Sequence, residues 1–292
     1  MFIADTSYAA TLQDHLNRTV RFALEEDLGN GDITAQLIPL ETAAKASVIT
    51  REAGVLCGRE WFTETFRQID DQIQLSWYVE DGNHVQPNDT LVDISGSARS
   101  ILTAERCALN FLQTLSGTAT AAHHYASRVA ETPVTILDTR KTLPGLRLAQ
   151  KYAALVGGCE NHRLGLYDRF LIKENHIMAC GGIRPAIEYA KALHAEVAVE
   201  VEVETMTQLD EAIDAGADIV MLDNFDTDAT RRAVERAAGR VKLESSGNFD
   251  LDRLNADLAA GAQVDFISVG AITKHVQALD LSLRLIMQPA DK

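Results

Sequence analysis

The chain has 292 residues, 46% of them hydrophobic and 24% charged, and a formal net charge of −15 at pH 7. These are globular values, and the length suggests one or two domains with a large core. The acidic balance argues against nucleic-acid and anionic-membrane partners, and no apolar run reaches the roughly 20 residues that cross a bilayer. The first 20 residues lack a secretory pattern and the four cysteines form no CxxC pair, which predicts a cytoplasmic protein.

The first 116 residues combine short strand patterns with an amphipathic helix. Residues 46–58 and 75–94 alternate apolar positions between turn residues, which predicts antiparallel hairpins. Residues 103–116 have helical apolar spacing, with Thr103 as the expected N-cap and Glu105 in the first turn. Arg106 and Asn110 follow one another at helical spacing on a separate polar stripe.

After Pro133 the pattern becomes strand, loop and helix, repeated, which predicts βα units and a parallel sheet. Polar residues follow the end of each predicted strand, and this favours a barrel with its active site at one face over an open sheet. The region holds about 140 residues, against roughly 250 for eight units, so the barrel is predicted to be incomplete. The predicted strands are residues 134–137, 170–172, 197–203, 219–222, 241–243 and 266–269, with helices at 182–194, 206–215 and 251–260.

Charge is divided sharply along this second region. Residues 138–176 contain seven Lys/Arg and four Asp/Glu, whereas residues 193–230 contain eleven Asp/Glu and no Lys or Arg. A cationic island in an acidic chain indicates a small anionic ligand. The acidic stretch beside it indicates a divalent metal.

Three glutamates, Glu200, Glu202 and Glu204, alternate with valines in the predicted strand 197–203 and just beyond it. They could form the solvated face of an edge strand. In a βα repeat, however, both faces of the sheet are covered, so the carboxylates would point into the barrel and need Lys or Mg²⁺ to compensate them. Asp223 ends the next strand and is expected beside Glu202.

Several strand ends carry candidate anion-binding residues. Lys173 is either a structural partner of the carboxylates or a substrate-binding or nucleophilic lysine. The pairs Arg140-Lys141 and His162-Arg163 could be surface charges, but their loops favour anion binding. Two turns of small residues on successive late strands favour a phosphate site. These turns are Ser245-Ser246-Gly247-Asn248 and Ser268-Val269-Gly270.

These motifs, in this order, resemble those of the quinolinate phosphoribosyltransferase family. The resemblance implies an N-terminal open-faced α/β sandwich domain over residues 1–116 and an incomplete α/β barrel over residues 117–292, with the C-terminal tail packing back on the first domain. The resemblance rests on residues 26–34, 105–110, 138–142, 161–166, 173–176, 200–202, 221–224, 244–247 and 268–270.

The resemblance also implies an activity of NAD biosynthesis. Quinolinate would react with 5-phosphoribosyl-1-pyrophosphate, with Mg²⁺ as cofactor, to give nicotinate mononucleotide, pyrophosphate and CO₂. The family forms dimers or assemblies of dimers with shared sites, so Arg106 would serve the neighbouring subunit. The implied catalytic residues are Lys141, Lys173, Glu202 and Asp223, and the last two would hold the metal. The implied substrate-binding residues are Arg106, Thr139, Arg140, Lys141, His162, Arg163, Lys173, Glu202, Asp223, Ser245, Ser246, Gly247, Ser268, Val269 and Gly270.

Three other functions compete with this interpretation. A related phosphoribosyltransferase could use another acceptor, and a Schiff-base aldolase could use Lys173. The hairpins of the first region could also belong to a biotinyl- or lipoyl-like carrier domain, but no lysine lies in the turn between them.

Overall fold

The computed structural model describes residues 6–247 and 249–287, which form two compact units. Of the described residues, unit 1 takes 6–123, 143–157 and 275–287, and unit 2 takes 124–142, 158–247 and 249–274. The sequence analysis placed a boundary after residue 116 and expected the C-terminal tail to pack back on the first domain. The structure divides the chain within helix α3 (Ala98–Val129) and returns residues 143–157, as well as the tail, to unit 1. No helix in the described ranges is long and apolar enough to cross a membrane.

Helix α3 extends beyond the predicted residues 103–116 at both ends. Thr103, expected as its N-cap, lies inside the helix, and its hydroxyl donates to Asp32 Oδ2 at 2.9 Å. Gly117 also lies inside the helix. A Cβ there would come within 2.0 Å of the Gln277 carbonyl oxygen, so this glycine permits a close backbone approach and does not end the helix.

We expect Gly117→Ala to destabilise the protein. A glycine-to-alanine change in an ordinary helix interior stabilises by about 0.5–1 kcal/mol. Here the new Cβ overlaps backbone that cannot rotate away, so the free energy of unfolding should fall by about 1–3 kcal/mol. Urea unfolding measures this, with Ser127→Ala on the exposed part of α3 as a control that should stay within about 0.5 kcal/mol of wild type. A more stable Gly117→Ala protein would contradict the contact.

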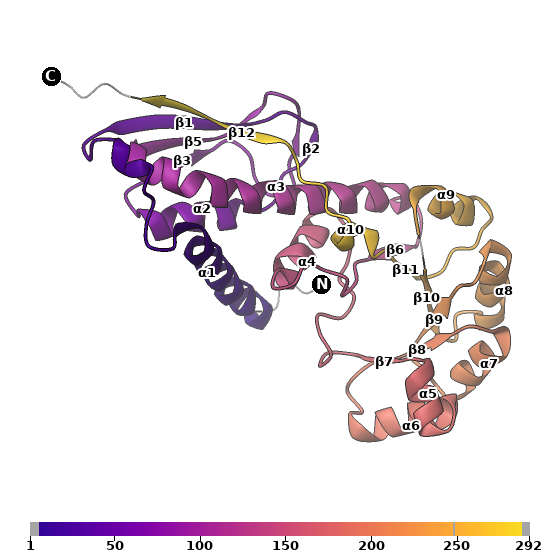
Figure 1. Cartoon of the computed structure of the whole chain (residues 1–292). Helices are drawn as coiled ribbons and strands as arrows, with labels where there is room; N and C mark the ends of the chain where they lie inside the picture. Colours follow the sequence, from indigo (N-terminus) through magenta and orange to yellow (C-terminus); the bar gives the residue numbers. More distant parts are fainter. Residues whose placement is uncertain (1–5, 248, 288–292) are drawn as a thin grey trace. The chain divides into compact units, whose positions relative to one another are not determined.

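Unit 1 is built on a four-stranded antiparallel sheet in the order β12-β1-β5-β3, with its helices on one face (Figure 1). Ala46, Val48 and Ile94 are buried in one core cluster with apolar residues of α2 and α3. Lys45 and Asp93 alternate with them on the less buried side. This confirms the open-faced α/β domain. Besides α3, the elements are α1 Thr6–Leu28, η1 Ala35–Leu37, β1 Ala43–Thr50, β2 Gly54–Val55, α2 Arg59–Ile69, β3 Gln74–Trp77, β4 His84–Val85, β5 Thr90–Ser97, α4 Arg147–Val156 and β12 Leu281–Met287.

Both regions with hairpin patterns form antiparallel strands. β3 pairs with β5 and β2 pairs with β4, so the partners are not neighbours in the chain. The tail returns as β12 and pairs with β1 from Ala44↔Met287 to Thr50↔Leu281. The sheet is therefore completed by a segment that follows all of unit 2 in the chain.

Unit 2 is a parallel sheet of six strands in the order β6-β11-β10-β9-β8-β7. The predicted strands are all present, within a few residues of the expected bounds. In the described ranges no strand joins β6 to β7, which confirms the incomplete barrel. The elements are β6 Thr135–Leu137, β7 Phe170–Ile172, α5 Glu174–Cys180, α6 Ile183–Leu193, β8 Val199–Val203, α7 Met206–Asp214, β9 Ile219–Asp223, α8 Thr227–Ala237, β10 Lys242–Ser246, α9 Leu251–Ala259, β11 Phe266–Ser268 and α10 Ala271–Lys274.

Helices that follow the strands begin at side-chain caps close to the strand ends. Thr205 accepts a hydrogen bond from the Gln208 backbone N–H at 3.2 Å, which caps α7. Asp226 caps α8 at 2.7 Å and Asp250 caps α9 at 2.8 Å. Each cap satisfies a backbone donor that the helix leaves open, and so fixes the short loop after the strand.

Candidate active site

The carboxyl ends of the unit 2 strands bring the predicted polar residues to one edge of the sheet, because all six strands are parallel. The register places Ser246 of β10 level with Asp223 of β9, and Ser268 of β11 level with Leu137 of β6. Residues from four segments far apart in the sequence therefore approach one another. This is the edge at which α/β barrels carry their active sites.

Thr139, Lys141 and Gly270 lie together at the ends of β6 and β11. A Cβ on Gly270 would be 3.0 Å from Lys141 Cδ and 3.5 Å from Thr139 Oγ1. The Thr273 hydroxyl donates to the Lys141 carbonyl oxygen at 2.9 Å and ties the two loops to each other. Gly270 thus lets the Lys141 stem lie close over the backbone, with the lysine residue itself exposed.

Arg140 and Arg163 form a partly buried pair of like charges. Burial and the positive charge of Arg140 lower the pKa of Arg163 from its ordinary value. Arg140 Nε is buried and has no hydrogen-bond partner within the described residues. Two guanidinium groups held close together favour an anionic ligand that accepts hydrogen bonds from both.

Asp138 fixes the loop that carries His162 and Arg163. It is fully buried, and its two oxygens accept hydrogen bonds from Asn161 Nδ2 at 2.7 Å and from the His162 backbone N–H at 3.0 Å. The backbone also bridges Leu137 to Glu160 in parallel fashion. The loop therefore continues the sheet edge beside β6.

Lys173 and Glu202 form an ion pair across β7 and β8. The sequence analysis expected Lys or Mg²⁺ to compensate these carboxylates, and Lys173 lies beside Glu202. Burial falls along the row of glutamates, from the fully buried Glu200 through the half-buried Glu202 to the exposed Glu204. The row therefore points inward at its start and reaches solvent at the strand end.

Asp223 ends β9 and accepts a hydrogen bond from its neighbour Asn224 at 3.0 Å. Glu202 lies level with Met221, two residues before Asp223. The two side chains lie on adjacent strands, and both keep oxygen atoms that suit Mg²⁺ with water and phosphate as further ligands. The donor set fits the metal that the resemblance implies.

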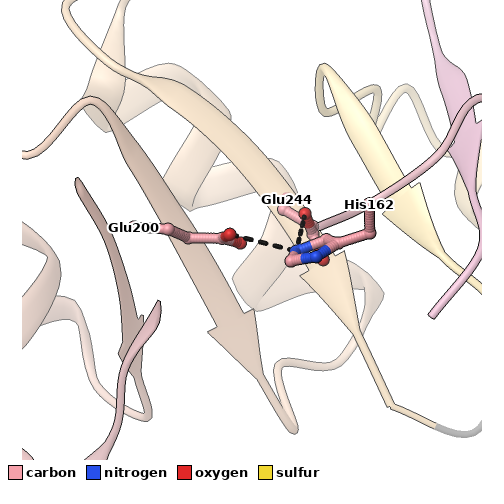
Figure 2. Close-up of side chains that lie close together, drawn as sticks. All are labelled: His162, Glu200 and Glu244. Atoms are coloured by element: carbon pink, nitrogen blue, oxygen red, sulfur yellow. Dashed lines mark ion pairs between the residues drawn. The ribbon is translucent and has the colours of Figure 1, made fainter. Parts of the chain in front are cut away.

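A buried cluster lies behind these residues and was not predicted as a unit: His162, Glu200 and Glu244 point toward one another from a loop and two strands (Figure 2). His162 Nε2 is 3.0 Å from Glu200 Oε2 and 3.4 Å from Glu244 Oε2. Arg169 reaches Glu200 at 3.5 Å. Burial alone raises the pKa of Glu200, but hydrogen bonding to His162 and the charges around it outweigh burial and lower it. Burial raises the pKa of Glu244, and contacts with His162 only partly offset it.

Two observations bear on whether the His162 ring carries one proton or two, and they point in opposite directions. Burial lowers its pKa, but hydrogen bonds and charges of the two glutamates outweigh burial and raise it to about 9. The Arg163 backbone N–H, however, donates to His162 Nδ1 at 2.8 Å, so Nδ1 carries no proton here. The amide contact decides the tautomer, because two N–H groups facing each other at that distance repel. The ring proton is therefore on Nε2, toward the glutamates.

The two small-residue turns differ in the hydrogen bonds that their polar groups make. Ser245 is buried and its hydroxyl has no hydrogen-bond partner within the described residues, which suits a ligand oxygen. Ser268 contacts Glu244, and the Val269 N–H donates to the Leu137 carbonyl oxygen at 2.9 Å. Asn248 lies outside the described residues. The Ser245 hydroxyl is therefore the polar group of these turns that is buried and unpartnered within the described residues.

Arg106 belongs to unit 1, on α3, and its residue is exposed together with Asn110 one turn later. The two form the polar stripe that the sequence predicts. The neighbours of Arg106 on the buried side, Cys107 and Leu109, pack in the core of unit 1. Arg106 is thus exposed to solvent, while the opposite face of α3 packs in the core of unit 1.

Comparisons with known proteins show which family has this pair of domains. The N-terminal domain of quinolinate phosphoribosyl transferase matches residues 32–116, and the C-terminal domain matches residues 118–284. The chain belongs to the quinolinate phosphoribosyltransferase family. The family match thus spans both the antiparallel sheet and the parallel sheet.

Individual relatives agree with the family. The nicotinate-nucleotide pyrophosphorylase [carboxylating] of Mycobacterium leprae is 42% identical over 279 residues, covering 93% of this chain and 98% of the relative. A probable enzyme of the same name from Bacillus subtilis is 39% identical over 259 residues, covering 88% and 89%. The solved nicotinate-nucleotide pyrophosphorylase of Francisella tularensis is 50% identical with a TM-score of 0.89, covering 94% of this chain and 96% of that one.

Proposed function

We propose that this protein is a carboxylating nicotinate-nucleotide pyrophosphorylase of NAD biosynthesis. It transfers the phosphoribosyl group of 5-phosphoribosyl-1-pyrophosphate to quinolinate, and releases pyrophosphate and CO₂ to give nicotinate mononucleotide. The family match over both domains carries this conclusion. The cationic strand ends of an otherwise acidic chain support it, because both substrates are anions.

The acceptor is held by its two carboxylates. Arg140 and Arg163 are arginines with planar forks that match carboxylate geometry, and the unpartnered Nε of Arg140 is available to such a ligand. Lys173 supplies a third cation, already oriented by Glu202. Together they neutralise the dianion and hold its ring nitrogen toward the phosphoribosyl donor, which is mainly a contribution of orientation.

The donor is held at its two phosphate ends. Lys141 neutralises the pyrophosphate as it leaves, and Glu202 and Asp223 would hold Mg²⁺ and favour the positive charge that develops on the ribose ring. The metal, when bound, supplies charge stabilisation to the leaving pyrophosphate. The ribose 5′-phosphate is assigned to Thr139 and to residues of the two small-residue turns. Those residues are Ser245, Ser246, Gly247, Ser268, Val269 and Gly270.

Decarboxylation follows ribosylation in this scheme. Once the ring nitrogen carries the ribose, its positive charge stabilises the electron pair left on the adjacent ring carbon as CO₂ departs, and that carbon then takes up a proton from solvent. No general base is required for either step. The protein therefore acts through positioning and electrostatics more than through proton transfer.

The assembly and the compartment are part of the same proposal. The protein forms a homodimer, or an assembly of dimers, in which Arg106 of one subunit binds substrate in the site of its neighbour. The exposed position of Arg106 on α3 supports this. The protein works in the cytoplasm, where its four free cysteines, three of them buried, stay reduced.

Activity is expected to depend on Mg²⁺. Leaving pyrophosphate and the two carboxylates would otherwise place several negative charges together, so excess EDTA should abolish turnover and added Mg²⁺ should restore it. Glu202→Gln should raise the Mg²⁺ concentration needed for half-maximal activity. Full turnover in excess EDTA, after exhaustive dialysis, would remove the proposed role of Glu202 and Asp223.

A comparison of acceptors tests the function itself. Nicotinate mononucleotide should form from quinolinate and 5-phosphoribosyl-1-pyrophosphate, while nicotinate, which lacks one carboxylate, should be a poor acceptor. Faster product formation from nicotinate would favour the related transferase. Trapping of a carbonyl substrate on Lys173 by borohydride would favour the aldolase, although an ion-paired lysine is poorly suited to that chemistry.

A further inference from the structure

A groove of about 690 Å³ lies between α1 and α3 in unit 1, and residues 143–146 of the same unit also line it. Two large apolar side chains of its lining, Phe22 and Leu143, are 68% and 37% exposed, and Phe111 of α3 adds a buried ring. Exposed apolar side chains gathered in a groove of this size mark a surface that binds a partner. This surface is called the α1–α3 groove below.

One part of the α1–α3 groove is acidic. Three consecutive acidic residues, 25–27, line it on the last turn of α1, whereas Arg18 and Arg21 line it on earlier turns. Burial raises the pKa of Cys107 on α3 to about 11, and two of these carboxylates add to the effect, so the acidic turn lies close to that cysteine. Cys107 directly follows Arg106 in the chain. The acidic part of the groove is therefore beside the turn of α3 that carries Arg106.

Unit 2 carries an exposed apolar loop, residues 164–168, whose shape is fixed from within. Asp168 accepts hydrogen bonds from the backbone N–H groups of Leu164 at 2.6 Å and Gly165 at 3.0 Å. A Cβ on Gly165 would come within 2.3 Å of Tyr167 Cε1, so the ring folds over this glycine. Leu166 and Tyr167 are nevertheless 72% and 78% exposed. Two large apolar side chains on a preorganised loop lose little freedom when they bind.

We propose that two copies of this chain dock by inserting Leu166 and Tyr167 of each apolar loop into the α1–α3 groove of the other copy. This inference deepens the proposed function and rests on its claim that Arg106 serves the neighbouring subunit. The loop begins one residue after Arg163, and Cys107 in the groove comes one residue after Arg106. The docked loop therefore brings Arg106 of one subunit toward Arg163 of the other, as a shared site requires.

Charge and hydrogen bonding also fit this occupant. The acidic turn of the groove, next to Arg106, faces the cationic strand ends of the other copy when the loop is docked, which is a complementary pairing. His15 also lines the groove, and its Nε2 is buried with no hydrogen-bond partner among the described residues. Burial and the charge of Arg18 lower the pKa of His15, so the neutral ring can accept a hydrogen bond from the Tyr167 hydroxyl.

Sedimentation of charged variants tests the docking. Tyr167→Asp puts a carboxylate at a solvent-exposed position of the free chain, so the fold should persist while the contact is lost. We expect the assembly to fall to about half of its wild-type mass. The dimer dissociation constant should rise about 30-fold for each of the two contacts, or roughly 1,000-fold in all. Phe22→Lys, in the groove, should have the same effect.

Mixing the two variants tests which surfaces pair. One contact of a mixed dimer is native, and the other joins the two introduced charges, which are opposite, so dimers should return. Tyr189→Asp is the matched control, because Tyr189 of α6 is a comparably exposed tyrosine of unit 2, at 62%, and it should leave the assembly intact. An unchanged mass of Tyr167→Asp, or a mixture that stays dissociated, would overturn the proposal.

Photo-cross-linking decides the question even if a charged variant fails to fold. Benzoylphenylalanine in place of Tyr167, in an assembly exchanged between nitrogen-15-labelled and unlabelled chains, should cross-link to the groove of the chain with the other isotope. The segments that line the groove are residues 15–27, 107–115 and 143–146. Cross-links confined to one chain, or directed to other segments, would contradict the docking.

The proposed function fails by a different result. A wild-type assembly that does not turn over quinolinate would refute the function, whereas mass and cross-links are measured without substrate. An active wild type whose Tyr167→Asp variant keeps its full mass would refute the docking alone.

Discussion

Mixing two nearly inactive variants, Arg106→Ala and Lys173→Ala, is expected to restore about a quarter of wild-type activity through mixed two-fold dimers. Lys173 lies at the strand ends of unit 2, and Arg106 is exposed on α3 in unit 1. If each site takes Arg106 from the neighbouring subunit, a mixed dimer has one doubly damaged site and one intact site. Random pairing makes half of the dimers mixed, which gives the expected recovery.

The matched control mixes Arg163→Ala with Lys173→Ala. Both residues belong to unit 2 of the same chain, so each site in a mixed dimer keeps one defect and activity should not recover. Subunit exchange is verified with differently tagged chains. A mixture of Arg106→Ala and Lys173→Ala no more active than its parents, despite exchange, would show that Arg106 acts within its own chain or not at all.

Arg163→Ala is expected to weaken quinolinate binding selectively. The loss of a charge-assisted hydrogen bond to a carboxylate costs about 1.5–3 kcal/mol, or about 10- to 150-fold in affinity. Binding of 5-phosphoribosyl-1-pyrophosphate should change less, because Lys141 and the small-residue turns hold that substrate. Calorimetric titration of each ligand separately measures both effects.

Arg163→Lys separates charge from geometry in this titration. It keeps the positive charge but loses the planar fork, so it should recover only part of the quinolinate affinity. Arg231→Ala, which removes an exposed arginine paired on α8, should leave both affinities unchanged. An equal loss for both ligands in Arg163→Ala would mean that Arg163 is structural or faces the donor.

The parallel sheet could be predicted closely because each strand is a buried apolar run followed at once by a polar residue. Strand β8 shows this well, since its valines are fully buried and its glutamates become more exposed toward the strand end. The signal is local, and every strand in unit 2 repeats it. The fold class and the edge that carries the site follow from such local patterns.

The organisation of unit 1 could be predicted only in part, because long-range contacts decide it. Gly117 reads locally as a helix end, but it is required by the backbone of Gln277, which lies 160 residues later in the chain. Leu281, Leu283 and Leu285 alternate with polar residues and so carry a strand pattern, yet nothing local indicates that β1 is their partner. Such pairings depend on register between distant segments.

The sequence indicated which residues belong to the site better than it indicated which of them contact one another. The Lys173–Glu202 pair follows from two neighbouring strands, and the sequence analysis anticipated a cation there. The buried cluster did not follow, because Glu200 and Glu244 lie on strands separated by β9, and His162 comes from a loop. The available signal for Glu244 was its position directly after the predicted strand 241–243.

Release of CO₂ from quinolinate labelled in the carboxylate adjacent to the ring nitrogen tests the central claim most directly. The proposed reaction predicts one labelled CO₂ and one pyrophosphate for each nicotinate mononucleotide formed, and none of the three without 5-phosphoribosyl-1-pyrophosphate. Labelled nucleotide that retains this carboxylate, or CO₂ released without the phosphoribosyl donor, would contradict the proposed function.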